Sequence, residues 1–292
     1  MRIGVFSGFA SPVATPEYIK AFARGAEERG FAEIWVAEHV VLFDEHQSAY
    51  PYDASGRFPI TGDAGLLDPF PTLGLLAAVT ERIRIGTGIC LVPQRNPVYT
   101  AKEVATTDWL SNGRLDFGVG VGWLAEEFAA LDAAFEHRGS RTVEYLEVMK
   151  SLWCDEVSSY QGRFYSLPEC RQYPKPVQSP HPPIYFGGES DAALRRVARI
   201  GEGWYGFGLA PDATAERVKQ LEQLLAEAGR SRADVDVVIS PYLQATTRDD
   251  VARYAEAGVD QLVILAPARD TASVPATLDH LVSEYLEPAS SL

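Results

Sequence analysis

The chain of 292 residues is 46% hydrophobic and 11% aromatic, which is typical of a globular protein with a substantial core. No apolar run approaches the ~20 residues of a membrane-spanning helix, and the first residues lack a signal-peptide pattern, so we expect a soluble, cytoplasmic protein with no membrane partner. The net charge of −14 repels phosphate backbones, and we therefore expect no nucleic-acid partner.

Strand-like and helix-like patterns alternate along the chain. After a first apolar run at residues 2–7, Thr15-Pro16-Glu17 supplies an N-cap, a proline and an early acid for a helix that Gly30 ends. Further strands are predicted at residues 32–39, 82–91, 115–121, 183–186, 203–207, 235–242 and 259–265. Helices are predicted at about 68–80, 98–110, 140–152, 190–200, 212–228, 247–257 and 274–286, with a shorter one after Trp123.

About eight strands that alternate with about eight helices require parallel strands joined by helical crossovers. The pattern predicts the α/β class and a single (β/α)8 TIM barrel domain over residues 1–292, with a doubly wound open sheet as the competing fold. Two long segments, about residues 40–67 and 153–183, have no helical or strand-like hydrophobic periodicity. They predict loop insertions at the C-terminal face of the barrel. The second is expected to contain a hairpin near Gln161-Gly162. Because barrel enzymes bind their substrates at that face, we expect both segments to cover the substrate.

Two glycine-rich stretches end predicted strands. One contains Gly118, Gly120 and Gly122, and the other is Gly187-Gly188-Glu189-Ser190. Glycine lets a flat ring or a phosphate approach the backbone, and close packing of a core strand is the alternative interpretation. The second stretch opens a helix, whose free N–H groups and dipole favour phosphate, although a tight turn with Ser190 as an ordinary N-cap has the same pattern. The Glu189 carboxylate must then point away from the phosphate.

Glu38 and His39 end the second predicted strand. Consecutive strand residues point to opposite sides, so a regular strand sends only one of them into the barrel mouth. A histidine that is simply hydrogen-bonded at a strand end is the alternative to a cofactor contact. The five histidines form no HxH pair and the three cysteines lie far apart, so no metal site is predicted. No lysine ends a predicted strand and no GxSxG motif occurs, which disfavours a Schiff-base aldolase and a serine hydrolase.

Six motifs, in order from about residue 2 to 208, together resemble the bacterial luciferase-like monooxygenase superfamily, and most of all its branch that uses the deazaflavin coenzyme F420. They are Trp35-Val36-Ala37-Glu38-His39, Arg84-Ile85-Gly86-Thr87-Gly88, Arg95-Asn96-Pro97, Leu110-Ser111-Asn112-Gly113-Arg114-Leu115, Gly118-Val119-Gly120-Val121-Gly122-Trp123 and Pro182-Pro183-Ile184-Tyr185-Phe186-Gly187-Gly188.

The resemblance implies a ring-shaped cofactor in the carboxyl-end mouth of the barrel, backed by a cis, non-proline bulge that would fall at Gly88-Ile89. It implies a set of cofactor-binding residues, namely Glu38, His39, Phe43, Thr87, Gly88, Ile89, Val121, Gly122, Gly187, Gly188, Glu189 and Ser190. Sugar-phosphate dehydrogenases of the superfamily carry a glutamate proton donor where this chain has Trp123, so their reaction is not transferred.

The resulting hypothesis is an oxidoreductase that moves a hydride between coenzyme F420 and an organic small-molecule substrate, with His39 or Glu38 as the catalytic group that handles the proton. An FMN-dependent luciferase-like monooxygenase is one alternative, because FMN also ends in a phosphate. A non-catalytic flavin-binding protein is another. By resemblance, the protein is expected to be a homodimer.

Overall fold

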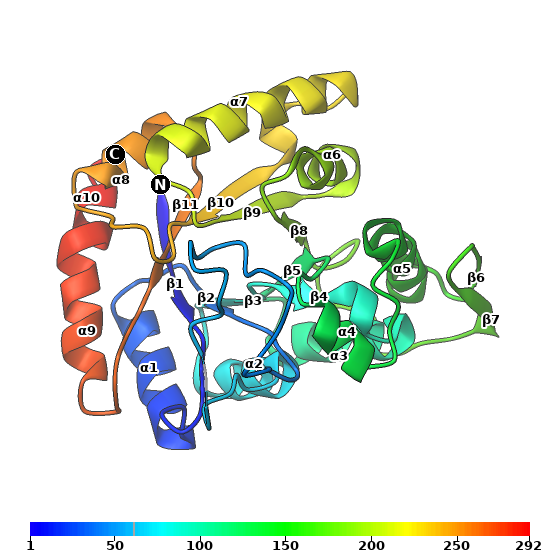
Figure 1. Ribbon diagram of the computed structural model, residues 1–292, viewed down its shortest axis with the longest axis horizontal. Helices are drawn as coiled ribbons and strands as arrows, with labels where there is room; N and C mark the ends of the chain where they lie inside the picture. Colours follow the sequence, from blue (N-terminus) through cyan, green and yellow to red (C-terminus); the bar gives the residue numbers. More distant parts are fainter. Residues whose placement is uncertain (61) are drawn as a thin grey trace.

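A computed structural model describes residues 1–60 and 62–292 of the chain (Figure 1). Within these residues, parallel strands form a closed barrel, because β3 pairs with β5 as well as with β2. Its eight strands are β1 (Arg2–Ser7), β2 (Glu33–Val36), β3 (Arg84–Thr87), β5 (Leu115–Gly120), β8 (Ile184–Gly187), β9 (Gly203–Phe207), β10 (Asp236–Ser240) and β11 (Gln261–Leu265). The predicted (β/α)8 barrel is confirmed.

Helices surround the barrel in Figure 1. They are α1 (Pro16–Glu28), α2 (Pro69–Val79), α3 (Pro97–Leu110), α4 (Ala125–Ala130), α5 (Arg138–Cys154), α6 (Asp191–Ile200), α7 (Pro211–Glu227), α8 (Asp250–Glu256), α9 (Val274–Leu281) and α10 (Glu287–Ala289). The short helical turns are η1 (Val92–Gln94), η2 (Arg232–Asp234) and η3 (Val282–Leu286). As predicted, Thr15 caps α1 by accepting a hydrogen bond from the Tyr18 N–H at 3.2 Å.

Two predicted strands are shorter or interrupted. The predicted strand 32–39 pairs only over Glu33–Val36, and Glu38 and His39 therefore follow the strand. The predicted strand 82–91 divides into β3 and β4 (Cys90–Leu91), and the cis peptide Gly88-Ile89 lies between them. That cis bond lies where the resemblance implied it.

The prediction that both long segments cover the C-terminal face is wrong for residues 153–183. This segment follows α5 and leads into β8, so it starts and ends at the amino end of the barrel. Gln178 donates to the carbonyl of Leu115, the first residue of β5, at 2.7 Å. The expected hairpin is present as β6 (Ser158–Gln161) and β7 (Ser166–Cys170), and it projects beyond α5 in Figure 1. The segment after β2, in contrast, starts at the carboxyl end of the barrel, as predicted.

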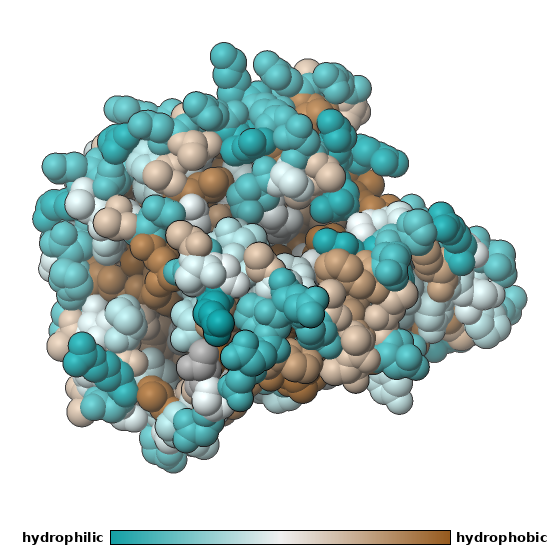
Figure 2. Space-filling model, viewed as in Figure 1, coloured by the Kyte–Doolittle hydropathy of each residue, from teal (hydrophilic) through white to brown (hydrophobic). Residues whose placement is uncertain are grey.

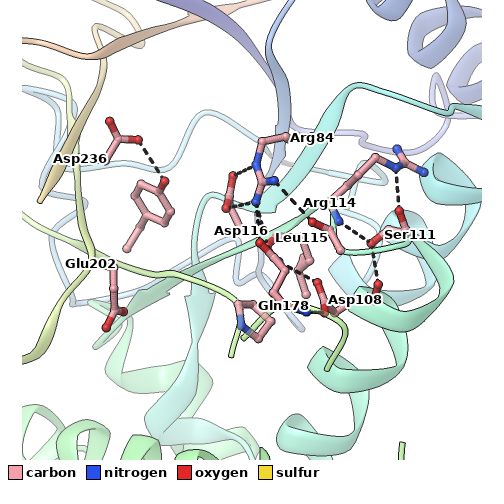
Figure 3. A network of polar contacts seen from close by, with 12 residues as sticks. Arg84, Asp108, Ser111, Arg114, Leu115, Asp116, Gln178, Glu202 and Asp236 are labelled. Atoms are coloured by element: carbon pink, nitrogen blue, oxygen red, sulfur yellow. Dashed lines mark hydrogen bonds and ion pairs between the residues drawn. The ribbon is translucent and has the colours of Figure 1, made fainter. Parts of the chain in front are cut away.

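The amino ends of the strands carry a network of polar side chains, drawn in Figure 3. Arg84, at the start of β3, donates to Asp116 of β5 at 2.6 Å and to Gln178 at 3.2 Å. Across the barrel, the hydroxyl of Tyr185 donates to Asp236 at 3.0 Å. This end of the barrel is therefore closed by interacting side chains.

Glu33 is the unusual member of this network. It is 1% exposed, and neither of its carboxylate oxygens has a hydrogen-bond partner among the described residues. Burial raises the pKa of Glu33 well above its usual value, and the neighbouring Asp116 carboxylate raises it further. The proton is therefore favoured on Glu33 in the folded protein.

Hydrophilic side chains cover the outer edge of the molecule where α7 and α9 lie (Figure 2). An aromatic layer that includes Phe6, Trp35 and Tyr205 fills the barrel interior above the polar network. None of the helices formed by the described residues has the length and hydrophobicity to span a bilayer.

Candidate active site

A cavity of about 510 Å³ opens at the carboxyl ends of the strands. Aromatic and aliphatic side chains form most of its wall. The segment between β2 and α2 contributes Tyr50, Tyr52, Phe58, Ile60 and Leu66. The strands and their following loops contribute Phe6, Ile89, Leu91, Tyr205, Phe207, Tyr242 and Leu265. A largely apolar cavity of this size at this end of a barrel is the expected place for a small organic ligand.

His39 lies in the wall of this cavity and contacts a carboxylate far away in the sequence. Its Nδ1 atom is 3.0 Å from Oε2 of Glu127, and the two side chains are 7% and 1% exposed. The indole N–H of Trp123 donates to Nε2 of His39 at 3.3 Å. Since Nε2 accepts that bond, we assign the proton of the neutral ring to Nδ1, which donates it to Glu127.

Glu127 is itself held in place by the backbone. Its Oε1 atom accepts the N–H of Val40 at 2.6 Å and that of Val41 at 3.3 Å. Sequence analysis missed Glu127, which lies in the first turn of α4, only five residues after Gly122. The acid-rich start of a helix directly after a glycine-rich strand end was the available signal.

The other predicted catalytic residue, Glu38, also lines the cavity, but its carboxylate is bound by groups of the protein. Its carboxylate pairs with Arg95 and accepts the N–H of Leu91. Burial raises the pKa of Glu38, and the positive charge of Arg95 opposes that rise. Glu38 therefore anchors the loop after β4, and of the two candidates His39 is the one with a nitrogen directed to cavity partners.

The glycines play two different roles. Gly122, Gly187 and Gly188 line the cavity together with Val121, Glu189 and Ser190. Gly122 and Gly188 have φ of +78° and +99°, values that residues with a side chain rarely adopt. Gly118 and Gly120 instead make room for their neighbours: a Cβ would meet the Thr87 carbonyl oxygen at 1.9 Å and the Ile89 side chain at 2.2 Å, respectively. For these two, close packing is the correct interpretation.

Two predicted cofactor contacts lie away from the cavity, whereas Gly88 and Ile89 line it. Thr87 is buried and donates its hydroxyl to the carbonyl of Gly118 at 2.7 Å. Phe43 faces a separate, much smaller pocket that it shares with Leu42 and Leu124. The regular alternation of β3 turns Thr87 outward, and the backbone between His39 and Phe43 carries the phenyl ring to the far side of Trp123.

Two glycine corners line the cavity: Gly122 forms the first, and Gly187 and Gly188 form the second. Glu189 directly follows the second corner. Its carboxylate accepts the N–H of Phe207 at 2.8 Å and the hydroxyl of Tyr52 at 3.2 Å, so it faces the aromatic side of the cavity. Burial raises the pKa of Glu189 to about 7, although both hydrogen bonds oppose the rise. Ser190 caps α6 by accepting from the N–H of Ala193 at 3.2 Å.

The cavity has little positive charge. Among the described residues, its wall contains no arginine and no lysine. Within residues 1–60 and 62–292 there is also no cluster of three histidine, cysteine, aspartate or glutamate side chains that would suit a metal ion.

This closed barrel, with a large cavity at its carboxyl end, belongs to the class of (β/α)8 proteins, in which active sites are built from the βα loops. A family model described as luciferase-like monooxygenase matches residues 1–285. The chain therefore belongs to the luciferase-like monooxygenase family.

Relatives of this chain include an uncharacterized protein and a protein with a cofactor in its name. An uncharacterized protein of Mycobacterium tuberculosis is 34% identical over 265 residues, which cover 90% of this chain and 92% of the relative. An F420-dependent glucose-6-phosphate dehydrogenase of Microbacterium testaceum is 29% identical over 282 residues, covering 94% of this chain and 79% of the relative.

Two solved structures have the same fold over nearly their whole length. The coenzyme F420-dependent tetrahydromethanopterin reductase of Methanopyrus kandleri has a TM-score of 0.76 at 18% identity, with 98% of each chain covered. The monooxygenase RslO1 of Streptomyces bottropensis has a TM-score of 0.77 at 20% identity, with 98% of this chain and 99% of that chain covered. Proteins of this fold thus include a reductase and a monooxygenase.

Proposed function

We propose that the protein is an oxidoreductase that moves a hydride between coenzyme F420 and an uncharged organic substrate. The observation that carries this proposal is His39, which lines an apolar cavity between two glycine corners and pairs with the buried Glu127 behind it. The names of the F420-dependent relative and of the F420-dependent structural neighbour support the choice of cofactor.

The residues around the cavity fit a planar cofactor that ends in a phosphate. Apolar and aromatic walls suit a ring system, and Ile89 at the cis bulge presents an aliphatic surface. Gly122 and Gly188 leave backbone exposed at positions where a side chain would be strained. Gly188 lies two residues before Ser190, the N-cap of α6, where free N–H groups favour a phosphate. When bound, the deazaflavin would supply the hydride chemistry.

The protein's own contribution is orientation, exclusion of water and proton transfer. The Nε2 atom of His39 accepts a hydrogen bond from Trp123, and a substrate hydroxyl that reaches Nε2 would replace the indole as donor. His39 then takes the substrate proton, and Glu127 stabilises the imidazolium that forms. Tyr50 and Phe58, which pack against each other and Trp123, shield this corner from water.

An uncharged substrate is proposed because the cavity wall among the described residues has no cation to pair with an anion. A sugar phosphate or a sulfonate would lose its hydration there without gaining an ion pair. Trp123 also stands where the resemblance places the glutamate of the sugar-phosphate dehydrogenases, so His39 is proposed as the proton-transferring group in its place.

The test is a side-by-side titration of the purified protein with F420 and FMN, followed by anaerobic turnover with alcohols, enones and imines. We expect saturable F420 binding and substrate-dependent change of the F420 absorbance. Tight FMN binding with substrate-dependent oxygen consumption would instead indicate an FMN-dependent monooxygenase. Binding without turnover of any substrate in the panel would indicate a non-catalytic flavin-binding protein.

A further inference from the structure

Two arginines stand together beside the cavity without an acidic partner. Arg138 begins α5, and Arg196 lies on α6. An Nη1 atom of Arg196 lies 3.1 Å from the point where a Cβ on Gly139 would be, so its guanidinium packs on the residue next to Arg138. Both arginines are half-buried. Neither forms an ion pair with any carboxylate of the described residues, although Arg84 and Arg95 elsewhere each pair with buried acids.

This arrangement is electrostatically unfavourable as it stands. Burial lowers the pKa of both guanidinium groups, and the charge of Arg138 lowers that of Arg196 further. The Nε atom of Arg196 is buried and has no hydrogen-bond partner among the described residues. A protein with a net charge of −14 has many carboxylates that could have neutralised the pair. An anion placed at the two guanidinium groups would remove the repulsion and satisfy the free donor.

Arg138 contacts Gly122, the first glycine corner of the cavity. Arg138 donates through Nε to the carbonyl oxygen of Gly122 at 3.0 Å. Its guanidinium also lies 3.8 Å from the centroid of the Phe135 ring, which fixes its orientation. Arg196 belongs to α6, whose N-cap Ser190 lies two residues after Gly188, and side chains on a helix tilt toward its amino end. The pair is therefore the cationic group that the cavity wall itself lacks.

We propose that Arg138 and Arg196 together form the subsite for the phosphoryl group of a flavin-type cofactor. This inference rests on the proposed function. Two guanidinium forks provide directional N–H donors, which suit phosphate oxygens better than single ammonium groups do. The anionic end of the cofactor thus leaves the apolar cavity between the glycine corners and pairs with arginine outside it.

The experiment compares cofactors with and without the phosphoryl group. F420 and the phosphate-free deazariboflavin form one pair of probes, and FMN and riboflavin form the other. Fluorescence titration gives the affinity of wild type, Arg138→Gln, Arg196→Gln and the matched control Arg199→Gln, which changes an exposed arginine on the same helix. We expect each of the first two substitutions to weaken binding of the phosphorylated probe roughly tenfold to a hundredfold. Affinity for the phosphate-free probe and the behaviour of Arg199→Gln should stay at the wild-type level.

The salt dependence of wild type provides a readout that requires no variant. Binding of the phosphorylated probe should weaken as NaCl rises, whereas binding of its phosphate-free partner should not. Equal wild-type affinity for both members of each pair, or equal losses for both members in the arginine variants, would overturn the subsite and leave the proposed function standing. Failure of wild type to bind any of the four probes would overturn both proposals. The pair that shows the difference identifies the source of the phosphoryl group.

Discussion

Nδ1 of His39 lies 3.0 Å from Oε2 of Glu127, although 88 residues separate the two side chains in the sequence. The same carboxylate receives the N–H groups of Val40 and Val41, so it fixes both the imidazole and the first residues of the segment that covers the cavity. A substitution of Glu127 should therefore change the tautomer of His39 while the barrel remains folded.

Glu127→Gln tests this coupling. The amide oxygen of glutamine can still accept the Val40 N–H, but its amide nitrogen donates to Nδ1 and forces the ring proton onto Nε2. We expect kcat to fall about tenfold to a thousandfold with little change in cofactor affinity, because general acid–base catalysis contributes about a hundredfold to ten-thousandfold. The measurements are steady-state kinetics across a pH series and a cofactor titration.

His39→Asn provides the second arm of the cycle. It should lower kcat at least as far as Glu127→Gln, and the double variant should be no slower than His39→Asn alone, because Glu127 acts through the imidazole. Losses that simply multiply in the double variant would show that the two residues act independently. A fall in melting temperature without a change in the pH profile would assign Glu127 a purely structural role.

The sequence predicted the barrel well because each strand and each helix has a recognisable local sequence pattern. Strand runs, helix caps such as Thr15 and Ser190, and the order of the elements are local properties of the chain. The predicted position of residues 153–183 was wrong because it rested on the length of the segment. A segment that follows a helix and precedes a strand lies at the amino end of the barrel. Topology alone would have placed it there.

The site was only partly accessible to sequence analysis. The glycine pattern predicts the cavity-lining Gly122 and Gly188, but it does not distinguish them from Gly120, whose adjacent space is filled by the Ile89 side chain. Glu127 was missed because its importance depends on where α4 meets the end of β2. Such contacts between distant segments have no periodic signal.

Gly188→Ala tests the second glycine corner, with Gly229→Ala as the matched control. Both glycines have positive φ, +99° and +72°, so alanine should cost each about 1–2 kcal/mol of stability. Nothing lies within 4 Å of a Cβ at Gly229, whereas at Gly188 it would point to Ala193 at 3.3 Å. Only Gly188→Ala should weaken cofactor binding. Thermal denaturation and cofactor titration of both variants distinguish strain from loss of the site, and equal affinities would place the cofactor elsewhere.

Glu33→Gln should stabilise the protein at neutral and alkaline pH. The folded-state pKa of Glu33 lies well above its usual value, so the favourable contribution of its protonated form is complete below about 4.5 and is lost as pH rises toward the folded-state pKa. Glutamine resembles the protonated acid at all pH values. The stability difference should grow by up to about 1.4 kcal/mol per pH unit. Urea denaturation of both proteins over a pH series measures it, and a difference that is constant with pH would contradict the raised pKa.

The affinity for F420 should fall as pH rises through about 7, because the pKa of Glu189 is raised to about 7 and this carboxyl group adjoins the Gly188 corner. Below that pH the group is neutral and tolerates a neighbouring phosphate; above it, the two negative charges repel. F420 is the suitable probe, because its phosphodiester does not titrate in this range. Fluorescence titrations across this range should show a loss of roughly fivefold for wild type. Glu189→Gln keeps a hydrogen-bonding side chain of the same shape and should bind F420 with an affinity that does not vary with pH. A pH dependence that persists in this variant would assign the titration to another group and remove Glu189 from the surroundings of the phosphate.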